Sequence, residues 1–214
     1  MKYYKKLIGE RIYLSPINVE DAEKYVEWFC DFKMTDGIGK SSSITTVQSE
    51  IEWIENNNKN GDLNFAIVDL ENDELIGNCG IMHINHKDRC AEVGIFIGNE
   101  EHRNKGIGAE TLRLLLDYGF NYLNLNNIHL EVMAFNERAI ACYKKVGFKE
   151  YGRRRESYFL NGKYYDHVFM DILAREFDGS YIKNKNIWED KTYEIIMNRL
   201  IRKLQKCYKN ISLL

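Results

Sequence analysis

Residues 94–120, GIFIGNEEHRNKGIGAETLRLLLDYGF, contain the junction that most constrains the fold. A short apolar run ends in a charged loop, and a long leucine-rich helical pattern follows. The first N–H groups of a helix lack intrahelical partners, and the helix dipole makes that end attractive to anions. Gly106 and Gly108 let the backbone approach such an anion closely, while Arg103 and Lys105 add positive charge. The junction therefore predicts a phosphate- or pyrophosphate-binding loop between a strand and a helix.

Two common phosphate loops do not match this segment. A P-loop requires lysine directly after its last glycine, and neither Gly106 nor Gly108 is followed by one. A dinucleotide fingerprint requires a third glycine at the position of Thr111, and it opens a βαβ unit, whereas this segment follows a hairpin pattern. Both alternatives are set aside.

The hydrophobic period changes several times along the chain. Two-residue alternation indicates strands, and three-to-four-residue spacing with capping residues indicates helices. The expected helices cover 18–32, a segment beginning near Thr45 or Thr46, 107–123 and 136–148. The expected strands cover 11–17, 63–70, 75–84, 90–98, 127–135 and a hairpin over 158–173 that turns at Asn161-Gly162.

The pattern changes again after Arg175, which divides the sequence into a domain over 1–175 and an extension over 176–214. The extension is expected to be mainly one amphipathic helix with basic flanks. We expect it to pack on its own domain, with a dimer contact or an acidic partner as the alternative. Its apolar stripe comprises Ile196, Leu200, Leu204, Cys207 and Ile211.

The motif R-x-x-G-x-G at 103–108 resembles the acetyl-coenzyme A pyrophosphate loop of the GCN5-related N-acetyltransferase (GNAT) superfamily. The segment FNERAIACYKKVGF resembles the second cofactor segment of that superfamily, N-x-x-A-x-x-x-Y-x-K-x-G-F. Residues 91–98, 116–132 and 158–170 resemble the ribosomal-protein alanine and spermidine acetyltransferase branch. The resemblance implies an α+β, three-layer fold. Its central sheet would be mostly antiparallel but mixed, with about seven strands flanked by helices.

The resemblance also implies which residues contact acetyl-CoA. Asn136 is a good helix N-cap in any protein, so its cofactor contact would be an additional role. Lys145 fits a cofactor phosphate or a solvated lysine about equally. The implied cofactor-binding residues are Ile95, Phe96, Ile97, Arg103, Asn104, Lys105, Gly106, Ile107, Gly108, Asn136, Ala139, Tyr143 and Lys145.

Acetyl transfer to an amine requires a neutral amine, a stabilised oxyanion and a protonated leaving thiolate. The family places a tyrosine near the sulfur of coenzyme A, so Tyr143 is the candidate acid; the alternative is a core aromatic beside Phe148. Glu92 is the candidate base, acting directly or through water. Strand alternation places Glu92 opposite the face of Ala91 and Val93, and a solvated acid is an equal alternative.

The expected function is an acetyl-CoA-dependent N-acetyltransferase in which a primary amine attacks directly within a ternary complex. A polyamine or diamine fits the resemblance to the spermidine acetyltransferase branch and the net negative charge of residues 1–190. An amino sugar or a protein N-terminal amine are the alternatives, as is a non-catalytic acyl-CoA sensor. The candidate substrate-binding residues are Trp28, Phe29, Glu92 and Tyr158, with Trp53 and Tyr165 as further walls, and the aromatic ones fit a core role equally.

Four metal-ligand side chains lie close together in the sequence: Cys79, His83, His86 and Cys90. Their spacing is not a standard zinc pattern. If residues 85–88 form a tight turn, His83 faces Cys90 across the hairpin. We expect no metal site, and ordinary packing of these residues.

The five cysteines form no C-x-x-C pair, which indicates free thiols in a reducing compartment. The N-terminus lacks the apolar core of a signal peptide, and no apolar run reaches the ~18 residues of a membrane span. Residues 191–214 carry six basic side chains and one acidic one, so the net charge of −2 leaves −7 on residues 1–190. We therefore expect a cytoplasmic protein that binds neither nucleic acid nor membranes. The family resemblance leaves a homodimer as an open alternative.

Overall fold

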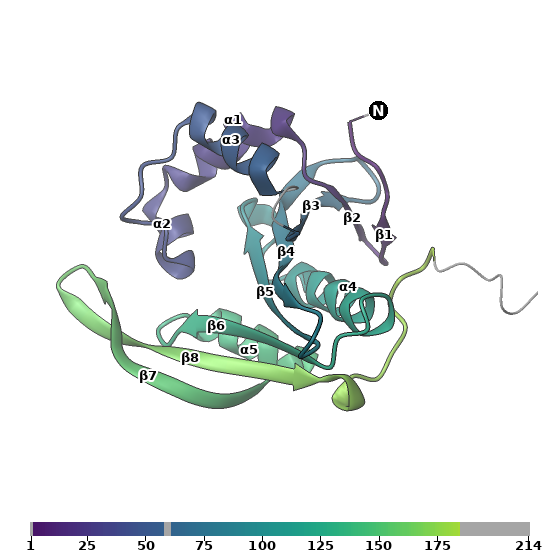
Figure 1. The fold of residues 1–214 in the computed structure, drawn as a ribbon. Coiled ribbons are helices and arrows are strands. Elements are labelled where there is room, and N and C mark those ends of the chain that lie inside the picture. Colours follow the sequence, from purple (N-terminus) through teal and green to yellow (C-terminus); the bar gives the residue numbers. More distant parts are fainter. Residues whose placement is uncertain (1, 58–60, 185–214) are drawn as a thin grey trace, which may run out of the picture. The chain divides into compact units, whose positions relative to one another are not determined.

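The computed structural model describes residues 2–57 and 61–184. Its centre is one eight-stranded sheet in the order β1-β2-β3-β4-β5-β6-β8-β7 (Figure 1). Neighbouring strands are antiparallel except for β5 and β6, which are parallel. The mixed, mostly antiparallel sheet is therefore confirmed. The strands are β1 (Leu7–Ile8), β2 (Ile12–Pro16), β3 (Leu63–Asp69), β4 (Leu75–Asn85), β5 (Cys90–Ile97), β6 (Asn127–Met133), β7 (Lys149–Leu160) and β8 (Lys163–Leu173).

Two strands differ from the sequence prediction. The two-residue strand β1 is too short to show any hydrophobic period. Strand β7 begins at Lys149 rather than near Tyr158, and its first half, KEYGRRRE, is almost entirely exposed. An exposed edge strand needs no apolar alternation, so the pattern that identifies buried strands misses it.

The helices follow the expected order. They are α1 (Ala22–Phe29), α2 (Phe32–Thr35), α3 (Val47–Asn57), α4 (Ile107–Asn121) and α5 (Glu137–Val146), with 3₁₀ turns η1 (Val19–Asp21), η2 (Asp36–Ile38), η3 (Glu100–His102) and η4 (Ala174–Glu176). Helix α3 begins directly after Thr46, as predicted.

The single helix expected over 18–32 is wrong. Asn18 does act as an N-cap, but it caps the 3₁₀ turn η1, where its side chain accepts from the N–H of Glu20. Helix α1 ends at Phe29, and Asp31 in an extended conformation caps α2 through the N–H of Lys33. The second cap competes with continuation of the first helix.

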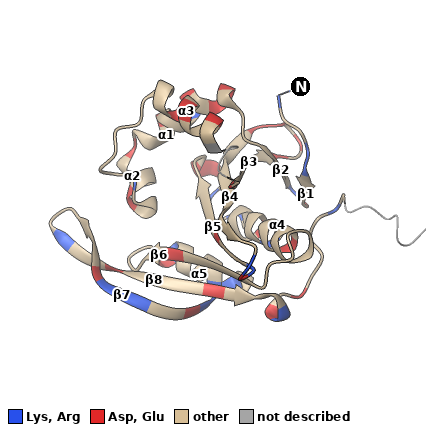
Figure 2. Cartoon of the chain, in the orientation of Figure 1, with Lys and Arg blue, Asp and Glu red and all other residues tan. Residues whose placement is uncertain are grey.

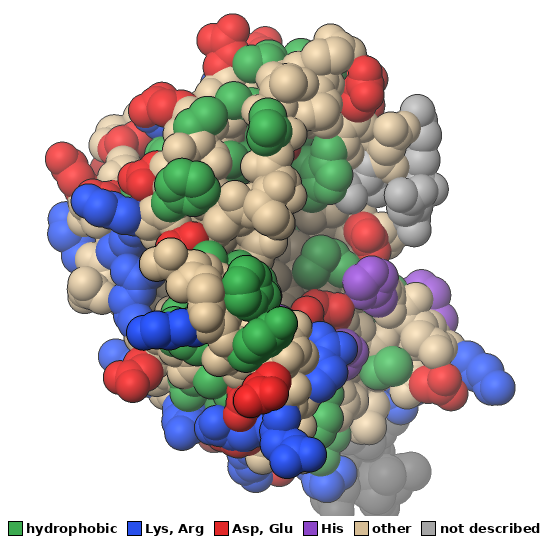
Figure 3. All heavy atoms as spheres, turned by 90° about the vertical axis from the view of Figure 1, so that its left-hand side faces the viewer, with side chains coloured by type: hydrophobic (Ala, Val, Ile, Leu, Met, Phe, Trp, Pro, Cys, Tyr) green, Lys and Arg blue, Asp and Glu red, His purple; other side chains and the backbone are tan. Residues whose placement is uncertain are grey.

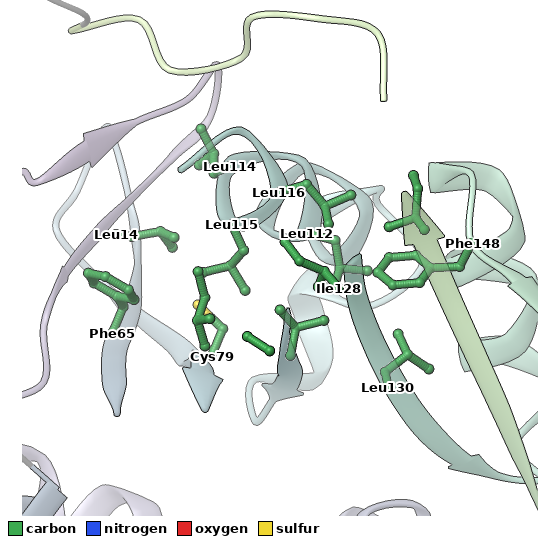
Figure 4. Packing of buried hydrophobic residues seen from close by; sticks show 14 of the residues in the cluster. Leu14, Phe65, Cys79, Leu112, Leu114, Leu115, Leu116, Ile128, Leu130 and Phe148 are labelled. Carbon is green, nitrogen blue, oxygen red and sulfur yellow. The ribbon is translucent and has the colours of Figure 1, made fainter. Parts of the chain in front are cut away.

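Both faces of the sheet are covered, and alternate residues of one strand contribute to different cores. In β2, Leu14 packs with α4, whereas Tyr13 packs with α1 and α3. Figure 4 shows the first cluster, in which Leu112, Leu115 and Leu116 of α4 point onto the sheet. These three leucines are fully buried, which contributes ~1.5–3 kcal/mol each relative to exposure. Helix α4 is thus held firmly on one face.

The chain continues to make core contacts beyond the domain boundary predicted at 175. The Oδ2 atom of Asp117 accepts from the backbone N–H groups of Tyr181 (2.6 Å) and Ile182 (3.0 Å). Ile182 belongs to the buried cluster under α4, and the compact unit extends to Lys183. The predicted C-terminal helix lies outside the described residues.

Cys30, Cys79, Cys90 and Cys142 carry free thiols in the structure, and Cys207 lies outside its described part. Among the helices of residues 2–57 and 61–184, none combines the length and apolar character needed to cross a bilayer.

Candidate active site

Strands β5 and β6 diverge, and this divergence opens the middle of the sheet (Figure 1). They pair only from Cys90 to Glu92 on β5 and from Asn127 to His129 on β6. Beyond this point β5 remains paired with β4 alone, and β6 remains paired with β8. The second half of β5 therefore presents one edge of its backbone to the space between the two strands.

A cleft of about 590 Å³ lies at this opening. Four backbone segments surround it: the end of β5, the loop into α4, helix α5 with the residue before it, and residues 33–38 of α2 and η2. It is lined by Lys33, Met34, Asp36, Gly37, Ile38, Ile95, Phe96, Ile97, His102, Arg103, Asn104, Gly106, Gly108, Ala109, Phe135, Asn136, Arg138, Ala139, Ala141, Cys142, Tyr143 and Lys145. Eleven of the thirteen predicted cofactor residues lie in this lining; Lys105 and Ile107 do not.

The loop that leads into α4 contains two residues in the left-handed region. Asn104 (φ 59°) and Gly106 (φ 84°) both adopt the left-handed region, which asparagine and glycine tolerate best. Gly106 is the N-cap of α4 and supplies no side-chain cap. The first N–H groups of α4 therefore depend on a bound group or on water.

The outer side of this loop is fixed to β2. The guanidinium of Arg11 donates to the carbonyl oxygen of Lys105 (2.5 Å) and forms an ion pair with Glu110 (2.9 Å). Glu110 also accepts from the backbone N–H groups of Glu10 and Arg11 at 2.7 and 2.8 Å. These contacts fix the loop with its helix N-terminus toward the cleft.

Arg103 lies inside the loop, with its side chain mostly buried. Its Nε and Nη2 atoms donate to the carbonyl oxygen of Ile97, at 3.1 and 2.8 Å. Burial and the nearby charge of Arg138 lower the pKa of the Arg103 guanidinium. Two cations thus lie close together at the cleft, an arrangement that an anion would stabilise.

Helix α5 forms the opposite wall. Asn136 is its N-cap, as predicted, and its Oδ1 accepts from the N–H of Ala139 at 3.2 Å. The amide Nδ2 of Asn136 donates to the carbonyl oxygen of Gly37 at 3.2 Å, which ties α5 to the turn after α2.

Tyr143 lies about two turns after Asn136 on α5, within the cleft lining. Its ring meets Phe148 edge-to-face, with centroids 6.0 Å apart. Burial, followed by the nearby Cys142, raises the pKa of the Tyr143 phenol well above its usual range. The phenol therefore keeps its proton throughout the physiological pH range and is available as a donor. The sequence posed a core aromatic beside Phe148 and an acid in the cofactor site as alternatives for Tyr143. In the structure its ring contacts Phe148 and also lines the cleft.

Several lining residues were not predicted, most notably Arg138. It lies in the first turn of α5, and the x positions of the N-x-x-A motif give no hint of it. Met34 and Ile38 come from a segment far from both motifs, and only the fold brings them to the cleft, whereas Phe135 directly precedes the motif residue Asn136. The basic side chains along β7, which Figure 2 shows, do not contribute to the lining.

Glu92 lies outside the cleft lining, near the point where β5 and β6 separate. Alternation along β5 is as predicted, because Ala91 and Val93 belong to the core under α4 and Phe96 belongs to the other one. The carboxylate of Glu92 lies 3.1 Å from Nδ1 of His83.

The candidate acceptor residues are dispersed. Trp28 is buried (6% exposed) and packs edge-on against Phe96, so it lies in the core. Phe29 is also packed against that core and does not line the cleft. Tyr158 lines a second hollow of about 500 Å³ between α2 and the β7–β8 hairpin. Figure 3 shows a hollowed face with hydrophobic side chains beside acidic and histidine side chains.

The expected pairing of His83 with Cys90 is wrong. Cys90 pairs with Asn85, and His83 instead contacts Glu92. The turn covers 86–89 rather than 85–88, and a bulge in β4 changes the register. Within residues 2–57 and 61–184, no group of three or more histidine, cysteine or acidic side chains is placed to hold a metal ion.

The comparisons with known proteins all match acetyltransferases. A family model described as acetyltransferase (GNAT) domain matches residues 11–149. The uncharacterized N-acetyltransferase p20 of Bacillus licheniformis is 31% identical over 176 residues, which cover 81% of this chain and 98% of that protein. The spermidine N(1)-acetyltransferase of Vibrio cholerae is 36% identical over 118 residues, which cover 55% of this chain and 67% of that protein.

The fold is similar to a solved structure of the same kind. The crystal structure of spermidine N-acetyltransferase from Vibrio cholerae in complex with CoA and spermine has a TM-score of 0.72 and 28% identity. The match covers 78% of this chain and 97% of that one.

Proposed function

The chain belongs to the GNAT acetyltransferase family, and on that premise we propose that it transfers the acetyl group of acetyl-CoA to a primary amine by direct attack in a ternary complex. The divergence of β5 from β6 beyond Glu92 and His129 carries this proposal. It leaves a strand edge, a helix N-terminus and a proton donor around one cleft.

The residues of the cleft fit a coenzyme A molecule. The edge of β5 at Ile95–Ile97 that no strand covers offers peptide groups to an extended amide-containing arm, apart from the carbonyl of Ile97, which accepts from Arg103. The uncapped N-terminus of α4 offers N–H groups to a pyrophosphate, with positive charge from Arg103, Arg138 and Lys145 nearby. When bound, acetyl-CoA supplies an activated thioester.

The roles proposed for Tyr143 and the β5 backbone follow from position and protonation, whereas that of Glu92, which lies outside the cleft lining, follows from the need to deprotonate the acceptor. Tyr143, protonated and in the lining, would donate its proton to the leaving sulfur and be reprotonated by the second proton that the nitrogen loses after its attack. Backbone N–H groups along β5 stabilise negative charge on the acyl oxygen. Glu92 takes the proton that the amine loses, directly or through water, because an ammonium has no lone pair with which to attack.

A polyamine or diamine is the acceptor we propose. The similar Vibrio cholerae proteins are named for spermidine, and residues 1–190 carry a net charge of −7, which favours a cationic acceptor. The alternatives are an amino sugar and a protein N-terminal amine. A non-catalytic acyl-CoA sensor ranks lower, because both Tyr143 and the R-x-x-G-x-G loop are present in the cleft.

The proposal is tested by thiol release from acetyl-CoA with spermidine, short diamines, amino sugars and short peptides. The wild type is compared with Tyr143→Phe and with the control Tyr4→Phe, whose exposed ring lies on the N-terminal segment. We expect turnover with a polyamine or diamine, a loss of about 100-fold in kcat for Tyr143→Phe, and none for Tyr4→Phe. Binding of acetyl-CoA without turnover on any amine would instead support a sensor.

A further inference from the structure

Strand β4 contains a bulge next to Glu92. The pairs Met82–Glu92 and Asn85–Cys90 enclose two residues of β4, His83 and Ile84, but only one of β5. Such an extra residue re-aims side chains, and bulges are common beside active sites. The chain therefore departs from regular pairing where the proposed base is held.

The bulge requires an unfavourable backbone conformation at His83. Its φ angle is +52°, in the left-handed region that non-glycine residues rarely adopt. The backbone N–H of His83 donates to Oδ1 of Asp62 at 2.9 Å, a contact from 21 residues away. A strained residue held by a specific partner is a pointer to function.

The consequence of the bulge is a direct contact between two side chains. Ile84 packs against the core under α4, as Ala91 does, so His83 is the residue added on the opposite face. There, Nδ1 of His83 lies 3.1 Å from Oε2 of Glu92. The Glu92 side chain is 25% exposed and that of His83 is 73% exposed. The His83 ring thus connects the partly buried carboxylate of Glu92 with bulk water.

We propose that His83 is a positioning residue for Glu92 and the route by which the proton of the acceptor amine reaches solvent. This inference rests on the proposed function, since it needs a base that deprotonates an amine. Glu92 first takes a proton from the ammonium group, which becomes a neutral amine. At rest the ring proton lies on Nδ1 and is donated to the ionised carboxylate of Glu92. Once Glu92 is protonated, the exposed ring changes to its Nε2–H tautomer by proton exchange with water, and the free Nδ1 then takes the proton as the O–H bond of Glu92 breaks. The resulting imidazolium then releases a proton to water, and both side chains return to their starting charge.

Other titratable groups surround the pair. His129 on β6 is the register partner of Glu92, but the hydrogen bond of Glu92 is made to His83. The charges of Glu92, Glu131 and Asp171 all act on Tyr151 of β7, which places these groups near one another. His83 is the imidazole that combines a direct bond to Glu92 with high exposure.

The test uses the full chain and two variants that tolerate a positive φ, His83→Gly and His83→Asn. Glycine leaves space for free imidazole, whereas asparagine fills part of the space and cannot carry a proton. His86→Gly is the matched control, because His86 lies in the exposed turn after β4. The readouts are kcat and KM for thiol release, with and without added imidazole, and the melting temperature of each variant.

We expect kcat to fall about 10- to 100-fold in both His83 variants, with KM for acetyl-CoA almost unchanged. Imidazole should restore kcat in His83→Gly and have no effect in His83→Asn, in His86→Gly or in the wild type. A His83→Gly variant with wild-type kcat would overturn the proposal, as would a folded variant whose loss imidazole does not relieve. A wild type that acetylates no amine would overturn the proposed function itself, and this outcome is visible before any variant is made.

Discussion

The side-chain amide of Asn136 joins two segments 99 residues apart, because its Oδ1 caps α5 and its Nδ2 donates to the carbonyl oxygen of Gly37. One residue thus fixes the helix that carries Tyr143 and the turn that covers the cleft. The family resemblance implies a cofactor contact for Asn136. The structure adds a role that holds the two walls of the cleft in place.

Asn136→Asp separates these two roles. Aspartate keeps the acceptor oxygen that caps α5, but it loses the N–H donor and turns an oxygen toward the carbonyl of Gly37. We expect the melting temperature to fall slightly and the Kd for CoA to rise several-fold. Asn136→Ala removes the cap as well and should cost a further ~1 kcal/mol of unfolding free energy. Equal stability and equal affinity of both variants with the wild type would show that the link to Gly37 is unimportant.

Gly106→Ala tests the loop conformation. The φ of +84° disfavours any side chain, and a Cβ atom there would lie 3.3 Å from the Arg11 guanidinium. We expect a loss of about 1 kcal/mol in unfolding free energy and a weaker affinity for CoA, measured by denaturant unfolding and calorimetry. Gly152→Ala is the control, because a Cβ atom there meets nothing within 4 Å. A Gly106→Ala protein that binds CoA as the wild type does would contradict the anion-loop assignment.

Arg138→Ala tests the charge of the cleft. Arg138 lies close to Arg103 and lowers the pKa of its guanidinium. A bound phosphate would therefore relieve the repulsion between these two cations. We expect Kd for CoA to rise about tenfold and its dependence on salt to weaken. Arg155→Ala, on the exposed part of β7, should leave both unchanged. Matching effects of the two substitutions would indicate only a change in net charge.

Glu50 gives a prediction on pH. Its side chain is buried (2% exposed), one carboxylate oxygen lacks a partner in the described structure, and burial raises its pKa while Lys40 opposes this. The folded state then binds the proton more tightly than the unfolded state, so this group destabilises the fold as pH rises through the raised pKa. Glu50→Gln should therefore be more stable than the wild type at pH 7, with the advantage shrinking toward the unfolded pKa of ~4.3. Thermal melts from pH 4 to 7 would show this trend, and an advantage independent of pH would contradict it.

Much of this fold could be read from the sequence because its core elements have clear periods. The two-residue alternation in β5 and the leucine spacing in α4 arise because these elements bury side chains at regular intervals. Hydrophobic periodicity detects that regular burial. The edge strand β7 and the two-residue strand β1 lack that signal, since exposed or very short strands need no apolar pattern.

The local motifs of the site were also readable, but the long-range contacts were not. The loop at 103–108 and the cap at Asn136 depend on neighbouring residues, whereas Arg138 and Met34 reach the cleft through tertiary packing. The His83–Glu92 contact depends on a one-residue bulge, which reverses the face of a side chain without a signature in composition. The assignment of His83 to Cys90 has a separate cause, because it assumed a turn at 85–88, whereas the turn covers 86–89.

The central claim is that the cleft between the diverging strands β5 and β6 holds coenzyme A. Amide hydrogen exchange of the full chain, with and without CoA, tests it most directly. We predict slower exchange with CoA in peptides that cover 94–98 and 104–109, together with the first turn of α5, and little change in β2 and β3. Binding of CoA with no protection in these segments, or with protection elsewhere, would contradict the account.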